Sequence, residues 1–276
     1  MSKAIVVLSG GQDSTTCLYW ALNQGYDNVK AISFDYGQMH SIELLAAECI
    51  ARDAGVWHEE IKLGNVLGGT SPLVNADAAL EQYENYDSLP GGLEKTFVPM
   101  RNQLFLTVAA NYAYVNGAGI LVTGVCQEDS GGYPDCTRPF IDALEVACRL
   151  GTFTGRDGAP NGLSIQTPLM DLTKAQSVDL AVRLDGCYAA LAQSHTSYDG
   201  KYPPTGHDHA TLLRAKGFAE AGIPDPLILR AWAEGLMDLP DDGSYQIGLD
   251  QWLDMAGIKR PNSVPVPGVV KRRRKK

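Results

Sequence analysis

A short apolar segment and the glycine-rich turn that follows it limit the fold of this chain more than any other sequence feature. Residues 4–8 read Ala-Ile-Val-Val-Leu, and residues 9–14 read Ser-Gly-Gly-Gln-Asp-Ser. An uninterrupted apolar run of this length is typical of a buried parallel strand, and the glycines predict a sharp turn into a helix. Because the first N–H groups of a helix lack backbone partners, the turn predicts a binding site for a pyrophosphate.

The same turn has a purely structural interpretation. Neither GxxxxGK[ST] nor GxGxxG, the two common nucleotide-binding motifs, follows the strand. The turn could simply open a helix over residues 14–24, with Asp13 or Ser14 as its N-cap.

Strands and helices alternate along the following hundred residues. The apolar spacing predicts helices over 14–24, 41–54 and 99–116, and buried strands over 29–34, 56–63 and 120–125. This order predicts an α/β fold built on a doubly wound parallel sheet. Residues 64–96 are rich in glycine and proline and break the alternation, and a connection of that length is usually functional.

Three predicted strands end in unusual polar segments, at residues 9–14, 35–38 and 124–136. In an open parallel sheet, ligands bind beyond the carboxyl ends of the strands. The coincidence of the three segments therefore predicts a single active site at that edge.

The chain after residue 150 predicts a smaller, helical part. A glycine-rich loop, a short strand near Ile165, a helix that opens after residues 171–173 and a helix over 208–221 precede a proline-rich end. We predict an α/β domain over 1–190, a helical C-terminal subdomain over 191–258 and a basic, disordered tail over 259–276.

Composition and charge narrow the class of protein. The chain has 276 residues, no apolar run long enough to cross a membrane and no leader pattern at its start. Its six cysteines are scattered without a CxxC pair, which favours a cytoplasmic protein with reduced thiols. The net charge is −9 although Lys271–Lys276 are all basic, so nucleic-acid contact is not expected except through that tail. A solvated terminus explains the tail more simply.

Several blocks of the sequence together resemble the 7-cyano-7-deazaguanine synthase family of the PP-loop ATP pyrophosphatase superfamily. The blocks are SGGQDSTTCL (9–18), FDYGQ (34–38), FVP and RN around Met100 (97–102), GV and GYPDC (124–136), TPLMDLTKA (167–175) and LLRAKGFAEAGIPDP (212–226). The resemblance implies a homodimeric ligase that uses ATP and Mg²⁺ on 7-carboxy-7-deazaguanine. Such enzymes activate the carboxylate as an adenylate, ammonia displaces AMP, and a second ATP drives dehydration of the amide to the nitrile, a step of queuosine biosynthesis.

The resemblance also implies site residues. The catalytic candidates are Asp13, Arg101 and Lys174, with Asp13 also a candidate Mg²⁺ ligand because hard cations prefer carboxylate oxygens. The nucleotide-binding candidates are Ser9, Gly10, Gly11, Gln12, Asp13, Ser14, Thr15, Phe34, Tyr36 and Arg101. The substrate candidates are Gln38, Tyr133 and Asp135, which offer an aromatic face and polar partners for a guanine-like edge.

The sequence departs from the family where the family carries four zinc-binding cysteines. The corresponding positions hold Ser197, Thr205, Asp208 and Thr211. Hydroxyls do not replace thiolates on zinc at neutral pH, so we expect no zinc site. His195, His207, Asp208 and His209 could form a substitute metal site, but neighbours in sequence point apart, and Asp208 is better explained as the N-cap of the helix that follows.

Other departures lie beside the expected base pocket. Met100 stands where the family usually has glycine, Thr137 where arginine is common, and Ser130-Gly131 replaces an aromatic-serine pair. Two alternatives therefore stay open: a repurposed ligase that joins the deazaguanine acid to another amine, such as a protein N-terminus, and a non-catalytic nucleotide-binding homologue.

Overall fold

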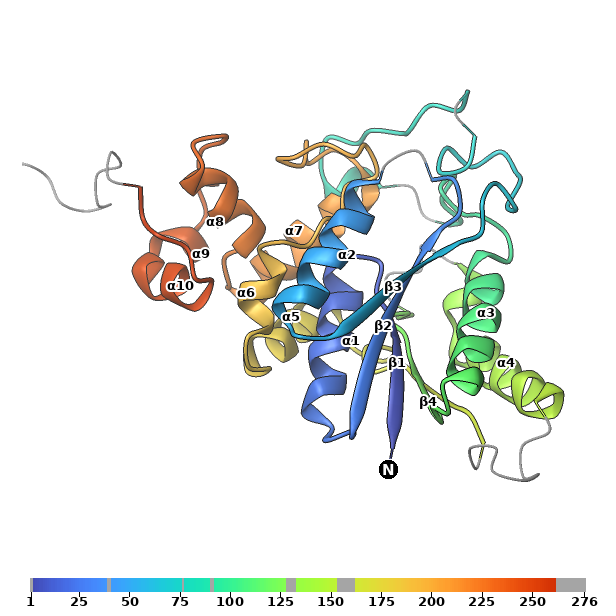
Figure 1. Cartoon of the computed structure of the whole chain (residues 1–276). Coiled ribbons are helices and arrows are strands. Elements are labelled where there is room, and N and C mark those ends of the chain that lie inside the picture. The colour runs from blue at the N-terminus through green and yellow to red at the C-terminus, as the bar shows by residue number, and fades with distance from the viewer. Residues whose placement is uncertain are drawn as a thin grey trace, which may run out of the picture.

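The fold is a parallel sheet with helices on both faces, as a computed structural model of the chain shows (Figure 1). The structure describes residues 2–38, 41–75, 77–89, 92–127, 133–152 and 162–261. The sheet has five strands in the order β3-β2-β1-β4-β5, and all four pairings are parallel. The strands are β1 (Lys3–Val7), β2 (Asn28–Asp35), β3 (Trp57–Lys62), β4 (Ile120–Val122) and β5 (Ser164–Gln166). The predicted doubly wound sheet is confirmed.

Alternating side chains of β1 divide the core between the two faces of the sheet. Ala4 and Val6 pack with α1, α2, α5 and α6, whereas Ile5 packs with α3 and α4. The helices are α1 (Gln12–Asn23), α2 (Ile42–Asp53), α3 (Arg101–Val115), α4 (Arg138–Gly151), α5 (Lys174–Arg183) and α6 (Cys187–Leu191). Because both faces are covered there, the central strands β1 and β4 are apolar on both sides, whereas the edge strand β3 is polar and largely exposed.

Two expectations about these helices need correction. Helix α1 begins at Gln12, not at residue 14, and its N-cap is Gly11, so the interpretation of Asp13 or Ser14 as N-cap is wrong. Helix α4 was not predicted, although its buried residues Ile141 and Leu144 stand at helical spacing. Both helices follow glycine-rich segments of the sequence, which obscure where the helix begins.

The C-terminal part is helical. It comprises α7 (His209–Ala221), α8 (Pro226–Ala233), α9 (Gly243–Gln246) and α10 (Leu249–Met255), and the last three lie away from the sheet in Figure 1. Asp208 caps α7, with its Oδ1 accepting the Thr211 N–H at 3.0 Å, as the sequence predicted. Of the basic tail, residues 262–276 lie outside the described residues, as do residues 128–132 of the altered pocket segment.

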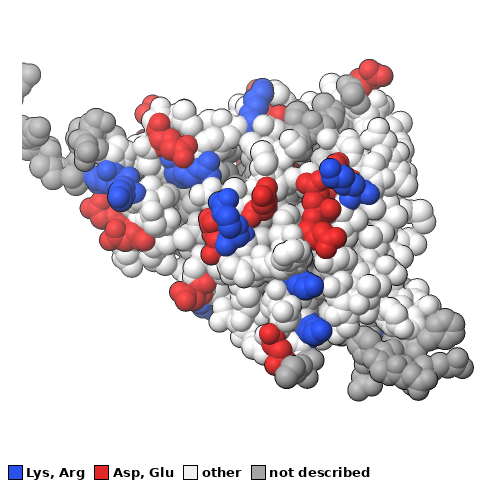
Figure 2. Space-filling view, in the orientation of Figure 1, with Lys and Arg blue, Asp and Glu red and all other residues white. Residues whose placement is uncertain are grey.

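Charges of both signs are interspersed on the face of the molecule seen in Figure 2. Among the described residues of this face, no continuous basic area is visible of the kind that a nucleic-acid backbone requires. Within the described ranges, no helix has the length and apolar character needed to cross a bilayer.

Candidate active site

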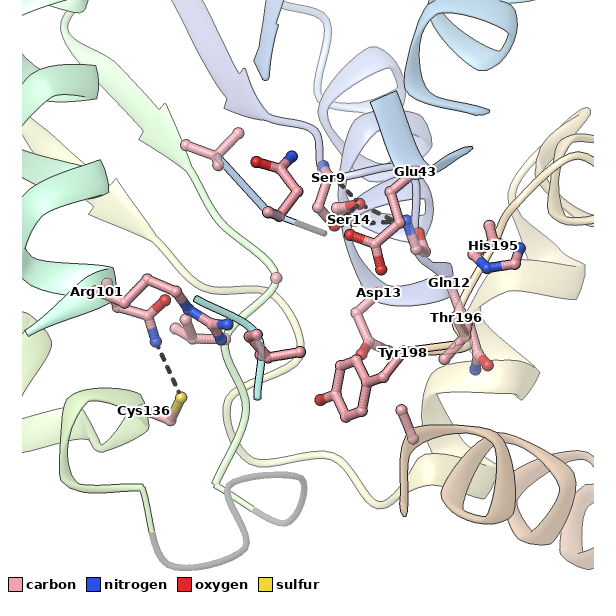
Figure 3. Close-up of a pocket in the computed structure, with 18 of the residues that line it drawn as sticks. Ser9, Gln12, Asp13, Ser14, Glu43, Arg101, Cys136, His195, Thr196 and Tyr198 are labelled. Atoms are coloured by element: carbon pink, nitrogen blue, oxygen red, sulfur yellow. Dashed lines mark hydrogen bonds between the residues drawn. The ribbon is translucent and has the colours of Figure 1, made fainter. Parts of the chain in front are cut away.

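A cavity of about 330 Å³ opens at the carboxyl ends of the strands (Figure 3). It collects side chains from all three polar strand ends. Eleven predicted site residues line it: Ser9, Gly11, Gln12, Asp13, Ser14, Phe34, Tyr36, Gln38, Arg101, Tyr133 and Lys174. Gly10, Thr15 and Asp135 are not among its lining residues. The sheet thus brings together residues that are up to 165 positions apart in the sequence.

The turn after β1 is held in shape by its own hydroxyls. The Ser9 and Ser14 Oγ atoms lie 3.0 Å apart, and the Ser14 Oγ also donates to the Gly11 carbonyl at 3.1 Å. Thr15 is fully buried and donates to the same carbonyl at 2.8 Å, so its role in the structure is to brace the turn. The turn and the start of α1 line the cavity, where N–H groups at a helix N-terminus suit an anion.

The two glycines of the turn are expected to respond differently to alanine. Gly10 has φ of +88°, and an added Cβ would overlap the Glu43 carbonyl oxygen of α2. We expect Gly10→Ala to lower the free energy of unfolding by about 3 kcal/mol, since both backbone strain and a backbone clash oppose it. Gly11 has an ordinary φ of −80°, and its added Cβ would make normal 3.5 Å contacts. Urea denaturation should find Gly11→Ala within about 1 kcal/mol of the wild type, and equal losses for both variants would contradict this account.

An ion pair of two residues that line the cavity joins the start of α1 to the start of α5. The Lys174 Nζ lies 2.7 Å from the Asp13 Oδ2, and the Lys174 side chain is only 9% exposed. Lys174 is the first residue of α5, whose N-cap is Thr173. The neighbouring Gln12 amide is buried, and neither its Nε2 nor its Oε1 has a hydrogen-bond partner among the described residues. A buried amide in this state favours a bound ligand, because an unsatisfied polar group costs about 1–3 kcal/mol.

Arg101 lies across the cavity from the turn (Figure 3). It is the first residue of α3, and its N-cap Met100 has φ of 63°, in the left-handed region that favours glycine. This conformation explains why glycine suits position 100. Burial raises the pKa of Tyr36, and the Arg101 cation opposes that shift. Arg101 thus places a permanent positive charge beside the aromatic wall.

The aromatic wall is formed by β2 and α3. The rings of Phe34 and Phe105 are stacked with their centroids 4.7 Å apart. The centroid of the Tyr36 ring lies 5.0 Å from that of Phe105. Gln38 folds back onto this turn, since its amide donates to the Phe34 carbonyl and accepts from the Tyr36 N–H. These contacts give the cavity a rigid apolar side.

Of the two substrate candidates Tyr133 and Asp135, only Tyr133 lines the cavity. The Tyr133 hydroxyl lies 2.6 Å from the Thr96 Oγ1, and its ring lines the cavity. Asp135 is buried and accepts the Asn102 N–H at 3.1 Å, at the start of α3. The structure therefore gives Asp135 a contact with the first turn of α3, and its direct contact with a substrate stays a prediction.

Sequence reasoning missed several lining residues, and Glu43 is the clearest case. Glu43 stands in the first turn of α2, and Figure 3 shows its side chain beside Ser9 and Ser14. Burial raises the pKa of Glu43 to about 7, although the Arg101 cation opposes the shift. His195, Thr196, Tyr198 and His209 were also missed, because they come from a segment that was considered only for metal binding.

The four positions that correspond to the zinc cysteines form a hydrogen-bond network. The Ser197 Oγ lies 2.6 Å from the Asp199 Oδ1 and 2.8 Å from the Asp208 Oδ2. Thr205 donates to Asp199 at 3.0 Å, and the Thr211 hydroxyl donates to the Asp208 carbonyl at 2.9 Å. These hydroxyls and carboxylates do not fit zinc, whose structural sites use thiolate and imidazole ligands. In the described part of the chain, no group of three or more His, Cys, Asp or Glu residues could hold a metal ion.

This network predicts a stability that does not depend on metal. Ser197→Ala removes the hydroxyl between two carboxylates and is expected to lower the free energy of unfolding by about 1–3 kcal/mol. The matched control is Thr107→Ala, an exposed hydroxyl that donates within its own helix. Addition of a chelator should leave the thermal midpoint of the wild type unchanged. A fall in that midpoint would show that a metal holds the segment.

The chain is similar to one family of known proteins over most of its length. Residues 3–222 match the model of a family described as "Queuosine biosynthesis protein QueC". A 7-cyano-7-deazaguanine synthase of Chromobacterium violaceum is 51% identical over 236 residues, which cover 84% of this chain and 95% of that protein. One from Gloeobacter violaceus is 49% identical over 230 residues, covering 82% and 96%.

Solved structures give weaker likenesses. A predicted subunit of a tRNA methyltransferase from Methanocaldococcus jannaschii has a TM-score of 0.43 at 21% identity, covering 66% of this chain and 76% of that one. The order and the parallel pairing of the five strands define the fold without these structures. The family match spans the turn after β1, the residues that line the cavity and α7, and the chain is therefore an enzyme of the family of the queuosine biosynthesis protein QueC.

Proposed function

We propose that the protein is an ATP-dependent ligase that converts 7-carboxy-7-deazaguanine and ammonia to 7-cyano-7-deazaguanine. One observation carries the proposal: a single cavity joins the helix N-terminus after β1, the cations Arg101 and Lys174, and an aromatic wall. The turn suits the phosphates of ATP, and the aromatic wall suits a planar base. The names of the relatives at 49–51% identity support the same product.

The phosphate side of the cavity would activate the carboxylate. Ser9, Gly11 and Ser14 would hold the pyrophosphate while the substrate carboxylate attacks the α-phosphorus of ATP and forms an adenylate. Arg101 and Lys174 would offset the negative charge that develops on the leaving group. Magnesium, bound through ATP and Asp13, would supply further charge neutralisation at the phosphates.

The base side of the cavity would hold the deazaguanine. Tyr133, Gln38 and Asp135 would orient the 7-carboxy-7-deazaguanine. Phe34 and Tyr36 would contact the ATP that lies beside it. Ammonia would attack the acyl carbon, and the bond to AMP would break with its electron pair on the departing oxygen. A second ATP would activate the amide oxygen for loss as AMP, which leaves the nitrile. A cytoplasmic location and a homodimeric state stay predictions.

The proposal is tested by exchange of labelled pyrophosphate into ATP. The exchange is expected to require 7-carboxy-7-deazaguanine and magnesium but not ammonia, since adenylate formation precedes amide formation. Exchange without the acid, or none with it, would refute the proposed activation step.

A further inference from the structure

A second, much smaller cavity adjoins the active-site cavity. Its volume is about 10 Å³, enough for one water-sized molecule. It lies where the segment before α3 packs on the start of α7, and the Tyr83 N–H donates to the His207 carbonyl there at 2.8 Å. Tyr198 and His209 line both cavities, so the two cavities are direct neighbours.

The carboxylates around the small cavity differ in how completely they are paired or hydrogen-bonded. Glu81 is paired with Lys95 and accepts from the Tyr83 hydroxyl. Asp208 accepts from Ser197 and from the N–H that it caps. The third carboxylate, Glu94, is only partly hydrogen-bonded.

Glu94 has one buried oxygen that no described residue satisfies. Its side chain is 3% exposed, and its Oε2 lies 3.2 Å from the Tyr83 hydroxyl, whose single proton it shares with Glu81. Its Oε1 has no hydrogen-bond partner in the described chain, and the His209 Nε2 lies 3.8 Å away. That distance is too long for a hydrogen bond, but both groups line the small cavity, so one small donor in the cavity can contact both.

His209 places a ring nitrogen beside this unsatisfied oxygen. Burial lowers its pKa, while the nearby Glu94 and Asp208 carboxylates oppose the shift and Lys174 adds to it. A neutral imidazole offers one acceptor nitrogen, and the Glu94 Oε1 beside it offers a second acceptor. The occupant that matches this site is therefore small, cationic and rich in N–H donors.

We propose that this small cavity binds ammonium and supplies ammonia to the active-site cavity. The inference rests on the proposed function, in which ammonia is the second substrate. Glu94 holds the ammonium ion through its Oε1. One N–H bond breaks, its electron pair stays on nitrogen, and the proton passes to the His209 Nε2. Neutral ammonia then moves past Tyr198 toward the acyl carbon.

Binding is tested first, without ATP or the acid, using ¹⁵N-ammonium chloride and unlabelled protein. Wild-type protein should give a ¹H–¹⁵N ammonium signal protected from solvent exchange, and Glu94→Gln should lose it. The matched control is Glu84→Gln, an exposed carboxylate on the same segment. A wild type without a protected signal, as expected if the cavity holds water alone, would overturn the proposal.

Kinetics then test delivery. Glu94→Gln is expected to raise the KM for ammonium roughly 10- to 100-fold, the loss of one hydrogen bond to a charged group. Its pyrophosphate exchange should stay at the wild-type level, because activation does not involve the small cavity. Potassium, similar in size to ammonium, should compete with ammonium in the wild type and not in the variant. An unchanged KM would overturn the inference, whereas loss of exchange in the wild type would refute only the proposed function.

Discussion

Asp13→Asn is expected to lower kcat roughly 10³-fold, since metal-assisted charge neutralisation supplies several kcal/mol and each 1.4 kcal/mol is about tenfold in rate. The Asp13 carboxylate faces the cavity and pairs with the Lys174 ammonium at 2.7 Å. Asparagine keeps the size of the side chain and removes the charge that would bind magnesium. The measurement is steady-state turnover to product, together with pyrophosphate exchange, which should fall by a similar factor.

A control for this prediction removes a charge elsewhere. Asp254→Asn changes an exposed carboxylate of α10 and should leave both rates within twofold of the wild type. Lys174→Met, on the other side of the pair, should act in the same direction as Asp13→Asn. Retention of exchange in Asp13→Asn would show that Asp13 serves the structure and not the phosphates.

The largest expected loss of stability comes from Arg214→Met. The Arg214 guanidinium is 3% exposed and forms two bonds to Asp225, with its Nε and Nη2 at 2.6 and 2.8 Å from the carboxylate. It also donates to the Ser194 and Thr196 hydroxyls at 2.8 and 2.9 Å. Methionine leaves the buried Asp225 carboxylate without its counter-charge, so the free energy of unfolding should fall by about 3–5 kcal/mol.

The double variant Arg214→Met/Asp225→Leu distinguishes a charge effect from a packing effect. Removal of both charges should recover part of the lost stability, because replacement of a complete buried pair is often nearly neutral. Lys216→Met, on the same helix, alters a cation with a 28% exposed side chain and should cost less than about 1 kcal/mol. A double variant that is less stable than Arg214→Met would show that packing dominates.

Local features of this protein could be predicted from its sequence. The strand over 4–8 and the cap at Asp208 depend on residues adjacent in the chain, and both are found in the structure. Helix α4 could also have been found, because Ile141, Leu144 and Cys148 have helical spacing. The proline and glycines before it instead suggested a continuing loop.

Contacts between distant segments could not be predicted in the same way. Glu94 meets His209 across 115 positions, and nothing in the sequence near either residue indicates the contact. Asp199, which joins Ser197 to Thr205, has no counterpart among the expected metal positions. Such pairs arise only once the sheet and α7 have set the relative positions of the loops.

The central claim is tested most directly by mass spectrometry of a reaction containing the protein, Mg-ATP, ammonia and 7-carboxy-7-deazaguanine. The account predicts 7-cyano-7-deazaguanine, with AMP and pyrophosphate formed for each of two activations. Amide alone would show that only the first activation takes place. Recovery of the unchanged acid, with ATP intact, would contradict the account.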